Sequence, residues 1–283
     1  MLKFVGDVLG QILNRRRYGL SSLLVGFALA PLWQLYKRII GLPLVLTTWK
    51  GTLFLLEPKS ITSSRFVYEL HPDERFIERL AAFAGKPEDN VTFVDVGANV
   101  GLFTVLLCRT FSRGVMFEPN PVAAAMARRN VALNEVSDKY RLIEAAVGKT
   151  LGTVAIPKVG VPDPALRVRY DAVDGVESLL VPMITLDSAI PDGAVVMKID
   201  AEGFDADVVE GFSAAFASYR VRLCLFESAE NEILERVLSI VTEKGYSVMD
   251  GSRQISRIDD ARGRDLFIVR NDLLPVYRCV VEA

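Results

Sequence analysis

A glycine-containing turn follows the apolar run at residues 91–96 and carries the most informative spacing in the chain. It reads Asp95-x-Gly97-x-Asn99-x-Gly101, with Ala98 between the glycine and the asparagine. A buried strand that turns sharply into a helix presents backbone N–H groups to a ligand. Turns that bind a pyrophosphate have a glycine where this chain has Asn99. The turn therefore predicts a nucleoside ligand without a pyrophosphate, contacted by this backbone and by Asp95, whose carboxylate could alternatively cap the following helix.

A second apolar run, at residues 115–117, ends in the carboxylate of Glu118, seventeen residues after Gly101. A carboxylate at a strand tip can accept hydrogen bonds from both hydroxyls of a ribose, and Glu118 is the residue we assign to that role. Pro119 fixes the direction in which the chain leaves the strand. Asn120 could orient the loop through side-chain to backbone hydrogen bonds, although turn chemistry alone would also explain it.

Two further acids lie close together in the segment Lys198-Ile-Asp200-Ala-Glu202-Gly203. With a period of two, Lys198, Asp200 and Glu202 share one face of a strand, and the cation keeps both carboxylates ionised. Methylation of an oxygen requires a group that accepts the hydroxyl proton, and we expect Asp200 or Glu202 to be that base. Together with Glu227 at the end of a later strand, these acids could also bind a divalent cation, a possibility we do not favour.

These motifs occur in the order expected of the FkbM family of S-adenosylmethionine (SAM) methyltransferases, which the chain resembles from about residue 66 to about residue 250. The resemblance rests on Asp95–Gly101, Phe117–Pro121, Leu133-Asn134, Ala145–Gly148 and Lys198–Gly203. It implies SAM as cofactor and transfer of its methyl group to a hydroxyl of a sugar, glycan or lipid-linked acceptor. Two other functions remain open, a nicotinamide oxidoreductase and a catalytically silent scaffold that docks at a membrane.

The resemblance also suggests roles for residues outside the two main motifs. It implies that the adenine passes the backbone of Ala145, and that Tyr68 and His71 line the acceptor side together with Glu227. His71 is the single histidine in the chain and precedes Pro72, so it could equally be a helix-start residue. Where the family's pattern usually has Glu two residues after Gly203, this chain has Asp205, which leaves the role of that carboxylate in doubt.

The pattern of strands and helices that positions these residues predicts an α/β fold. From residue 91 on, apolar runs alternate with helical stretches. The apolar runs lie at 91–96, 114–118, 141–147, 195–200, 221–227, 246–250 and 266–270. One helical stretch begins at about residue 101, and the others lie at 121–133, 204–216 and 230–243. We expect a doubly wound, seven-stranded, mostly parallel sheet of the class I methyltransferase type over residues 91–275. A proline-containing β-rich insertion at 152–191 should supply substrate contacts, with Arg167, Arg169, Tyr170 and Asp171 as candidates.

Residues 44–90 are expected to form a hairpin and a helix that cover the core, after a basic and apolar segment at 1–43. Residues 18–36 carry no charge and are flanked by basic clusters, so this segment could lie on a membrane, cap the protein or span a bilayer. Trp33 and Tyr36 resemble an interfacial anchor. We therefore expect a possible anionic membrane surface as partner through residues 15–38, and a cytoplasmic location, peripheral on the inner face of the membrane.

Charge and cysteine content exclude several classes of protein. Residues 1–50 hold seven Lys or Arg and one acid, and the rest of the chain holds 26 basic and 34 acidic residues. A catalytic region with this acidic balance argues against a nucleic-acid substrate. The three cysteines are far apart in sequence, which favours reduced thiols in the cytoplasm. The expected partner is a small molecule or glycan, and the oligomeric state is not predicted.

Overall fold

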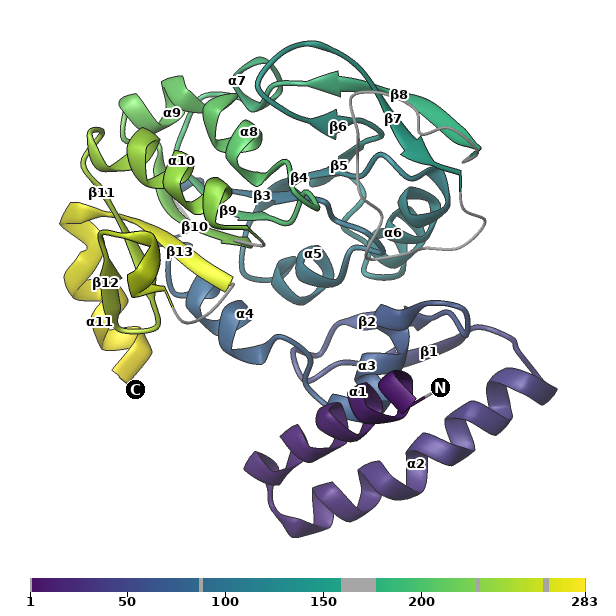
Figure 1. Ribbon diagram of the computed structural model, residues 1–283. Coiled ribbons are helices and arrows are strands. Elements are labelled where there is room, and N and C mark those ends of the chain that lie inside the picture. Colours follow the sequence, from purple (N-terminus) through teal and green to yellow (C-terminus); the bar gives the residue numbers. More distant parts are fainter. Residues whose placement is uncertain (1, 87–88, 159–176, 228–229, 262–264, 283) are drawn as a thin grey trace.

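The computed structural model describes residues 2–86, 89–158, 177–227, 230–261 and 265–282. Eight strands form its main sheet: β3 (Thr92–Val96), β4 (Arg113–Phe117), β5 (Tyr140–Ile143), β9 (Val195–Ile199), β10 (Val221–Glu227), β11 (Tyr246–Asp250), β12 (Arg253–Ile255) and β13 (Asp265–Arg270). Their order is β12-β11-β13-β10-β9-β3-β4-β5, seen nearly edge-on in Figure 1. The strands from β10 to β5 run parallel, and β13, β11 and β12 add an antiparallel edge. The α/β class is confirmed, with the short β12 as one strand more than expected.

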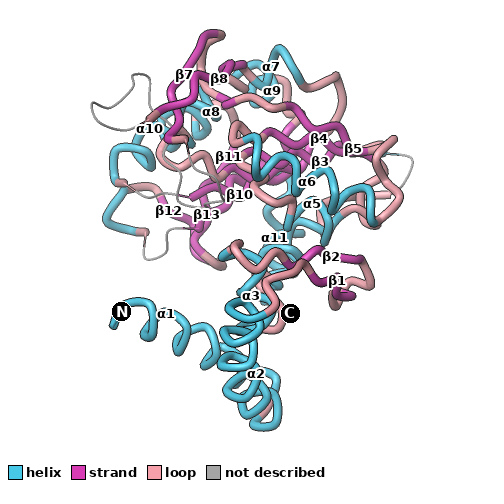
Figure 2. Tube along the Cα trace, turned by 90° about the vertical axis from the view of Figure 1, so that its right-hand side faces the viewer, coloured by secondary structure: helices cyan, strands magenta, loops and turns pink. Residues whose placement is uncertain are grey.

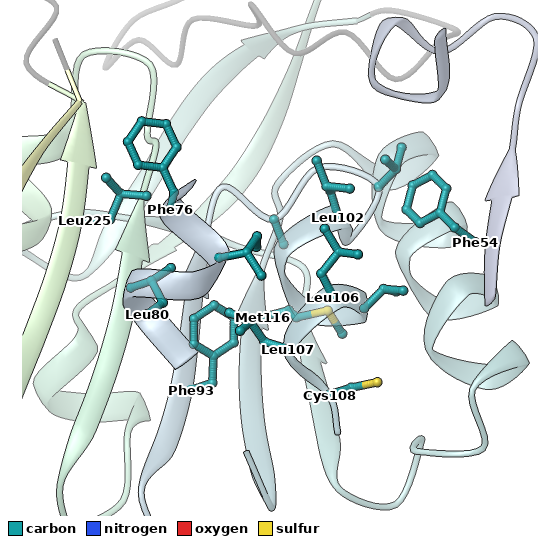
Figure 3. Close-up of a cluster of buried hydrophobic side chains, with 14 of the residues drawn as sticks. Phe54, Phe76, Leu80, Phe93, Leu102, Leu106, Leu107, Cys108, Met116 and Leu225 are labelled. Carbon is teal, nitrogen blue, oxygen red and sulfur yellow. The ribbon is translucent and has the colours of Figure 1, made fainter. Parts of the chain in front are cut away.

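Helices cover both faces of this sheet because successive strand residues point to opposite sides. On one face, Phe93 packs with α4 (Glu74–Ala81), α5 (Leu102–Leu107) and α6 (Pro121–Leu133) in the cluster shown in Figure 3. On the other face, Val94 packs with α8 (Asp205–Glu210), α9 (Ser213–Ala217) and α10 (Asn231–Thr242). Both apolar layers extend under the ends of β3 and β9, so the loops at those ends rest on a rigid base.

The chain places its strands first on one side of β3 and then on the other. The chain passes from β3 outward to β4 and β5, and then returns to place β9 and β10 on the opposite side of β3. In an open α/β sheet, the loops at the carboxyl ends of the two central strands diverge at such a point and leave a crevice for a ligand. Here those two loops begin at Gly97 and Asp200.

A smaller sheet stands beside the end of β5. It contains β6 (Ala146–Val147), β7 (Gly152–Pro157) and β8 (Ser178–Ile184) in the order β6-β8-β7, and the short helix α7 (Leu186–Ala189) follows it. The expected β-rich insertion is therefore present in its described part. The strand predicted at 141–147 is divided, because the chain leaves the main sheet after Ile143 and Ala146 pairs with Met183 of β8. The candidate contacts at 167–171 lie outside the described residues.

The N-terminal helices pack as a separate layer below the sheet. α1 (Leu2–Leu13) and α2 (Leu20–Ile39), joined by the 3-10 turn Asn14–Tyr18, pack against α3 (Ile61–Glu69), with α2 on the outside (Figures 1 and 2). The Arg15 guanidinium is buried and donates to the carbonyls of Val67 and Tyr68 at the end of α3. It thereby satisfies backbone acceptors that a helix end leaves unpaired.

A hairpin of β1 (Leu44–Thr47) and β2 (Leu53–Leu56) connects this layer to the sheet domain. Two amides of α6 hold it. Asn134 accepts from the N–H of Leu53 and donates to its carbonyl, and Asn130 accepts from the N–H of Leu55. These side chains bind the exposed edge of β2 in the way a neighbouring strand would.

The structure corrects the expected role of Trp33 at a membrane interface. Its ring is buried and its Nε1 donates to Ser64 Oγ of α3, 3.0 Å away. None of the helices in the described part of the chain has the length and apolar character that crossing a membrane requires. Three helices of the described residues were not expected: α3, whose Ser60 cap accepts from Ser63 N, α7 at the end of the β-rich insertion, and α11 (Leu274–Glu282), which packs on α4.

Candidate functional site

A pocket opens at the crevice between β3 and β9, the place where an open α/β sheet typically binds a ligand. The motif residues that line it come from the ends of the central strands and from the loop after β5. They are Gly97, Ala98, Asn99, Glu118, Pro119, Ala145, Lys198, Asp200 and Glu202. The two loops predicted from spacing in the sequence therefore meet in space.

The first loop depends on glycine at two positions. Gly97 has φ of +66°, and a Cβ placed on it would lie 1.9 Å from the backbone oxygen of Asp200. Any side chain here would push the two loops of the crevice apart. Gly101 has φ of +81°, and a Cβ there would lie 3.4 Å from Ala127 of α6, so its main contribution is the left-handed backbone that begins α5.

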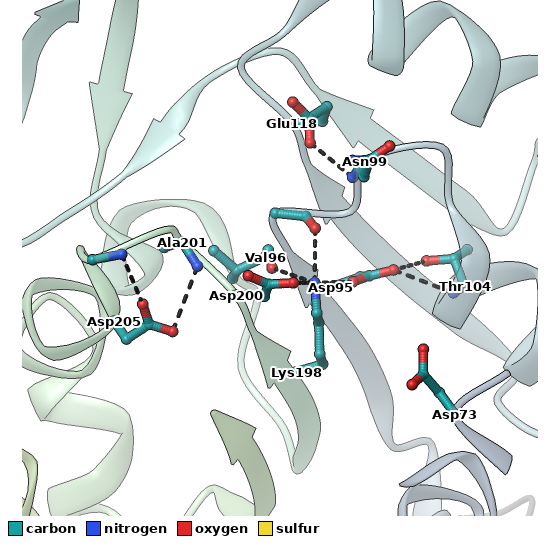
Figure 4. Close-up of polar contacts among 12 residues, drawn as sticks. Asp73, Asp95, Val96, Asn99, Thr104, Glu118, Lys198, Asp200, Ala201 and Asp205 are labelled. Atoms are coloured by element: carbon teal, nitrogen blue, oxygen red, sulfur yellow. Dashed lines mark hydrogen bonds and ion pairs between the residues drawn. The ribbon is translucent and has the colours of Figure 1, made fainter. Parts of the chain in front are cut away.

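Glu118 is buried at the end of β4 and holds the first loop in place. One carboxylate oxygen accepts from the backbone N–H of Asn99 at 2.7 Å (Figure 4). The other accepts from the backbone N–H of Asn120 at 2.8 Å. Burial raises the pKa of Glu118 to about 7, although these two hydrogen bonds oppose the shift. Asn120 in turn caps α6 by accepting from Val122 N, so the tip of β4 and the start of α6 form one bonded unit.

Asp95 lies beneath the pocket rather than in its lining. Its Oδ2 accepts from both the N–H and the hydroxyl of Thr104, at 3.2 and 2.7 Å, which caps α5. Burial raises the pKa of Asp95, and the nearby Lys198 opposes that rise. The capping alternative is therefore the role that this structure shows for Asp95.

Lys198 is buried between the two loops and carries a positive charge. Its Nζ donates to the carbonyl of Gly97 at 2.7 Å and lies 3.3 Å from Asp200 Oδ2 and 3.9 Å from Asp95 Oδ1. Burial alone would lower the pKa of Lys198, but the charges of Asp200 and Asp95 outweigh burial and raise it. A lysine held protonated in this way neutralises the crevice and cannot serve as its base.

The second loop presents the carboxylates of Asp200 and Glu202 to the open side of the pocket. Glu202 has φ of +49°, a backbone conformation that this tight turn imposes. The buried Asp205 supports the turn by accepting from the N–H groups of Ala201 and Gly203. Burial, aided by the charge of Asp200, raises the pKa of Asp205 to about 7. Asp205 therefore has a positioning role, which resolves the doubt raised by its short side chain.

A third wall comes from the N-terminal layer and was not predicted. Thr62 and Arg65 of α3, with Asp73 at the start of α4, complete the lining. Arg65 donates to both Glu69 and Asp73, and the two charges raise its pKa although burial opposes them. Glu69, four residues after Arg65, was the available signal, since opposite charges at this spacing pair on one face of a helix.

The profile of the methyltransferase FkbM domain matches residues 95–248, which is more than half of the chain. The chain belongs to this family. Family membership makes it a SAM-dependent methyltransferase. The methyltransferase sdnD of Sordaria araneosa is 24% identical over 220 residues, which cover 65% of this chain and 83% of that protein.

Solved structures of methyltransferases also align with the chain. The methyltransferase FkbM from Methylobacillus flagellatus KT is 16% identical with a TM-score of 0.44, over 73% of this chain and 53% of that one. This FkbM methyltransferase chain thus spans about half the length of that protein. TYW2 of M. jannaschii, in complex with AdoMet, is 17% identical with a TM-score of 0.39, over 80% of this chain and 83% of that one.

The residues of the FkbM site fit a SAM molecule. Asn99 lines the pocket with a buried Oδ1 that has no hydrogen-bond partner among the described residues, so a ligand donor can bind there. Glu118 and Ala145 line the same pocket as Asn99. Glu118, the Gly97 loop and Ala145 would hold the cofactor at the inner end of the pocket.

Three expected acceptor residues do not line this pocket. Tyr68 is buried and its hydroxyl accepts from Gln34 of α2. The ring of His71 lies between Trp49 and Tyr18, and its Nδ1 is 2.9 Å from Glu74 Oε1. His71 therefore joins the N-terminal layer to α4, whereas Tyr68 joins α3 to α2. Glu227 ends β10 opposite Asp265. In the described part of the chain no group of three metal-ligating side chains, Asp200, Glu202 and Glu227 included, is placed to bind a cation.

Proposed function

We propose that this FkbM methyltransferase methylates a hydroxyl group of a sugar, glycan or lipid-linked acceptor. The observation that supports this is the presence of three carboxylates, Asp73, Asp200 and Glu202, in the lining of one pocket. Ionised carboxylates accept hydrogen bonds from hydroxyls and repel anionic acceptors. The SAM molecule supplies the methyl group, and the chain must remove one proton from the acceptor.

Asp200 is the candidate for that proton transfer. It is half-buried at the end of β9, faces the pocket and lies beside the cationic Nζ of Lys198. A carboxylate in this place can accept a hydrogen bond from the acceptor hydroxyl and then its proton, as a general base does. Glu202 lies two residues further on the same loop, so the two acids must be separated by experiment.

The first test replaces each acid with its amide. We expect Asp200→Asn to lower the rate of methyl transfer from labelled SAM to a panel of sugars and glycans by about 10²- to 10⁴-fold. Binding of S-adenosylhomocysteine, measured by calorimetry, should stay unchanged because Asp200 faces the acceptor side. The matched control is Glu202→Gln, and a loss confined to that variant would transfer the role of base to Glu202. Transfer to amines or thiols but to no hydroxyl would refute the proposed acceptor class.

The second test concerns the cofactor end of the pocket. We expect Glu118→Ala to weaken binding of S-adenosylhomocysteine by about 10- to 100-fold, because charge-assisted hydrogen bonds contribute ~1.5–3 kcal/mol each. Glu144→Gln is the control, since Glu144 lies just after β5, pairs with Arg128 and does not line the pocket. Equal affinities of the two variants would remove Glu118 from the ribose role.

A further inference from the structure

The outward side of α2 exposes an unusual concentration of apolar side chains. We call Leu20, Leu24, Val25, Phe27, Leu32 and Leu35 the α2 outer face, and each is exposed in the range of 43–71%. Within this described helix, no exposed residue from Leu20 to Leu35 carries a charge, and Ser21 is the one with a polar side chain. Apolar surface clustered in this way marks a binding site for a protein or a membrane.

The opposite side of α2 explains why this face points outward. The buried stripe of the helix consists of Gly26, Ala30 and Trp33, and it packs on α1 and α3. Gly26 makes room for Arg15, because a Cβ on Gly26 would lie 2.6 Å from Arg15 Cδ. Trp33 is fixed by its hydrogen bond to Ser64. With the inward stripe held by these contacts, the helix cannot rotate its leucines into the protein.

Basic residues flank the α2 outer face at both ends. Arg16 and Arg17 precede the helix, Lys37 and Arg38 end it, and the sequence from residue 8 to residue 56 contains no acid. Arg17 is paired with Glu74. A symmetric pairing of two copies through this face would still bring Arg16 and Arg38 together with no acid in residues 8–56 to compensate them, which is unfavourable. An anionic partner with an apolar interior matches both the leucines and the flanking cations.

We propose that the α2 outer face docks on the surface of an anionic lipid bilayer. The helix lies along the bilayer plane, with its leucines inserted among the acyl chains and Arg16 and Arg38 against lipid phosphates. Arg15 takes no part, because it is buried in the contact with α3. Within the segment 15–38, which the sequence suggests as a membrane-contacting surface, the lipid contact is thus restricted to the α2 outer face, Arg16 and Arg38.

One consequence rests on the proposed function. α3 contacts α2 on one side through Ser64 and lines the pocket on the other through Thr62 and Arg65. With the α2 outer face on lipid, α2 would lie between the lipid surface and α3, the helix that lines the acceptor side of the pocket. The polar part of a lipid-linked acceptor could then reach Asp200 while its acyl chains stay in the bilayer.

The experiment is flotation of the full-length protein with lipid vesicles, followed by immunodetection. Vesicles of phosphatidylcholine with phosphatidylserine should carry the protein upward, and pure phosphatidylcholine should carry less of it. We expect Leu24→Gln/Leu32→Gln to reduce the vesicle-bound fraction at least about tenfold, as the loss of two inserted leucines requires. The matched control is Leu151→Gln/Leu180→Gln, whose leucines are 67% and 69% exposed on the smaller sheet, and it should float like the unmodified protein.

A second variant tests the charges. Arg16→Gln/Arg38→Gln should abolish the preference for phosphatidylserine and the sensitivity of binding to salt. All variants should bind S-adenosylhomocysteine normally, which reports on folding and on the cofactor site independently of the membrane. Absence of flotation, or equal flotation of both leucine variants, overturns the proposal. So does a dimer that Leu24→Gln/Leu32→Gln dissociates while vesicles have no effect, because the face would then join two copies.

Discussion

The crevice between β3 and β9 buries charged side chains, whereas the outer helix α2 exposes apolar ones. In the crevice, Asp95, Glu118 and Lys198 are buried, and each is held by hydrogen bonds or an opposite charge. Along α2, leucines face outward and the inward stripe is made of small residues and one tryptophan. Burial alone does not identify the functional surface of this protein. Both regions hold side chains in surroundings that oppose their chemistry, and these are the two regions to which we assign a function by proposal.

The largest effect expected in this comparison comes from removing the buried cation. Lys198→Met leaves the buried carboxylate of Asp95 without its opposite charge, and breaking such a pair typically lowers the free energy of unfolding by ~3–5 kcal/mol. Thermal unfolding followed by circular dichroism measures the loss. Adding Asp95→Asn to this variant should restore part of the stability, and a double variant less stable than the single one would contradict the pairing.

A matched pair of leucines sharpens the contrast between the two regions. Leu106 in α5 is 1% exposed and Leu32 in α2 is 59% exposed. Leu106→Ala should lower the free energy of unfolding by ~2–5 kcal/mol through the cavity it creates. Leu32→Ala should change it by less than about 0.5 kcal/mol, as for most surface substitutions. Chemical denaturation of both variants checks this, and similar losses would mean that α2 packs against something in solution.

The smallest expected effect is a dependence of cofactor binding on pH. The pKa of Glu118 is raised to about 7, so lowering the pH through that value protonates the carboxylate and reduces its acceptance of ribose hydroxyls. Affinity for S-adenosylhomocysteine should fall about tenfold for each pH unit below 7. Calorimetric titrations over a pH series measure this, with Glu118→Gln as a variant whose affinity should not vary.

The Glu118 carboxyl also affects the stability of the cofactor-free protein. Low pH, which weakens cofactor binding, favours this stability. A carboxyl whose pKa is raised in the folded state binds its proton more tightly there than in the unfolded chain. It therefore stabilises the cofactor-free protein at low pH, and this contribution is lost as the pH rises through about 7. A melting temperature of the free protein that falls across this window in the parent but not in the Glu118→Gln variant would agree with it. Parallel profiles for both proteins would not.

Local patterns predicted the cofactor end of the site well. The spacing of Gly97, Asn99 and Glu118 lies within one β-α-β unit, where neighbouring parallel strands bring their tips to one edge. The role of Asp95 was left between two alternatives, because the direction of its side chain depends on the start of α5. The structure shows the capping contact through Oδ2 of Asp95.

The acceptor side was predicted less completely. Thr62 and Arg65 come from α3, whose sequence Ile61–Glu69 contains several serines and β-branched residues that disfavour a helix assignment. Its helix is stabilised by packing against α1 and α2, which no local pattern reports. Tyr68 and His71 were assigned from the motif neighbourhood, but the turn at the end of α3 directs them toward α2 and Trp49. Sequence proximity to a site residue did not decide which side chains face the pocket.

The amides of Asn130 and Asn134 have a consequence for solubility. They occupy the backbone N–H groups of Leu53 and Leu55 and the carbonyl of Leu53. An unpaired strand edge is a template on which other chains can assemble into aggregates. At β2 the protein occupies that edge with two of its own side chains, so these backbone groups are not open to pairing with another chain.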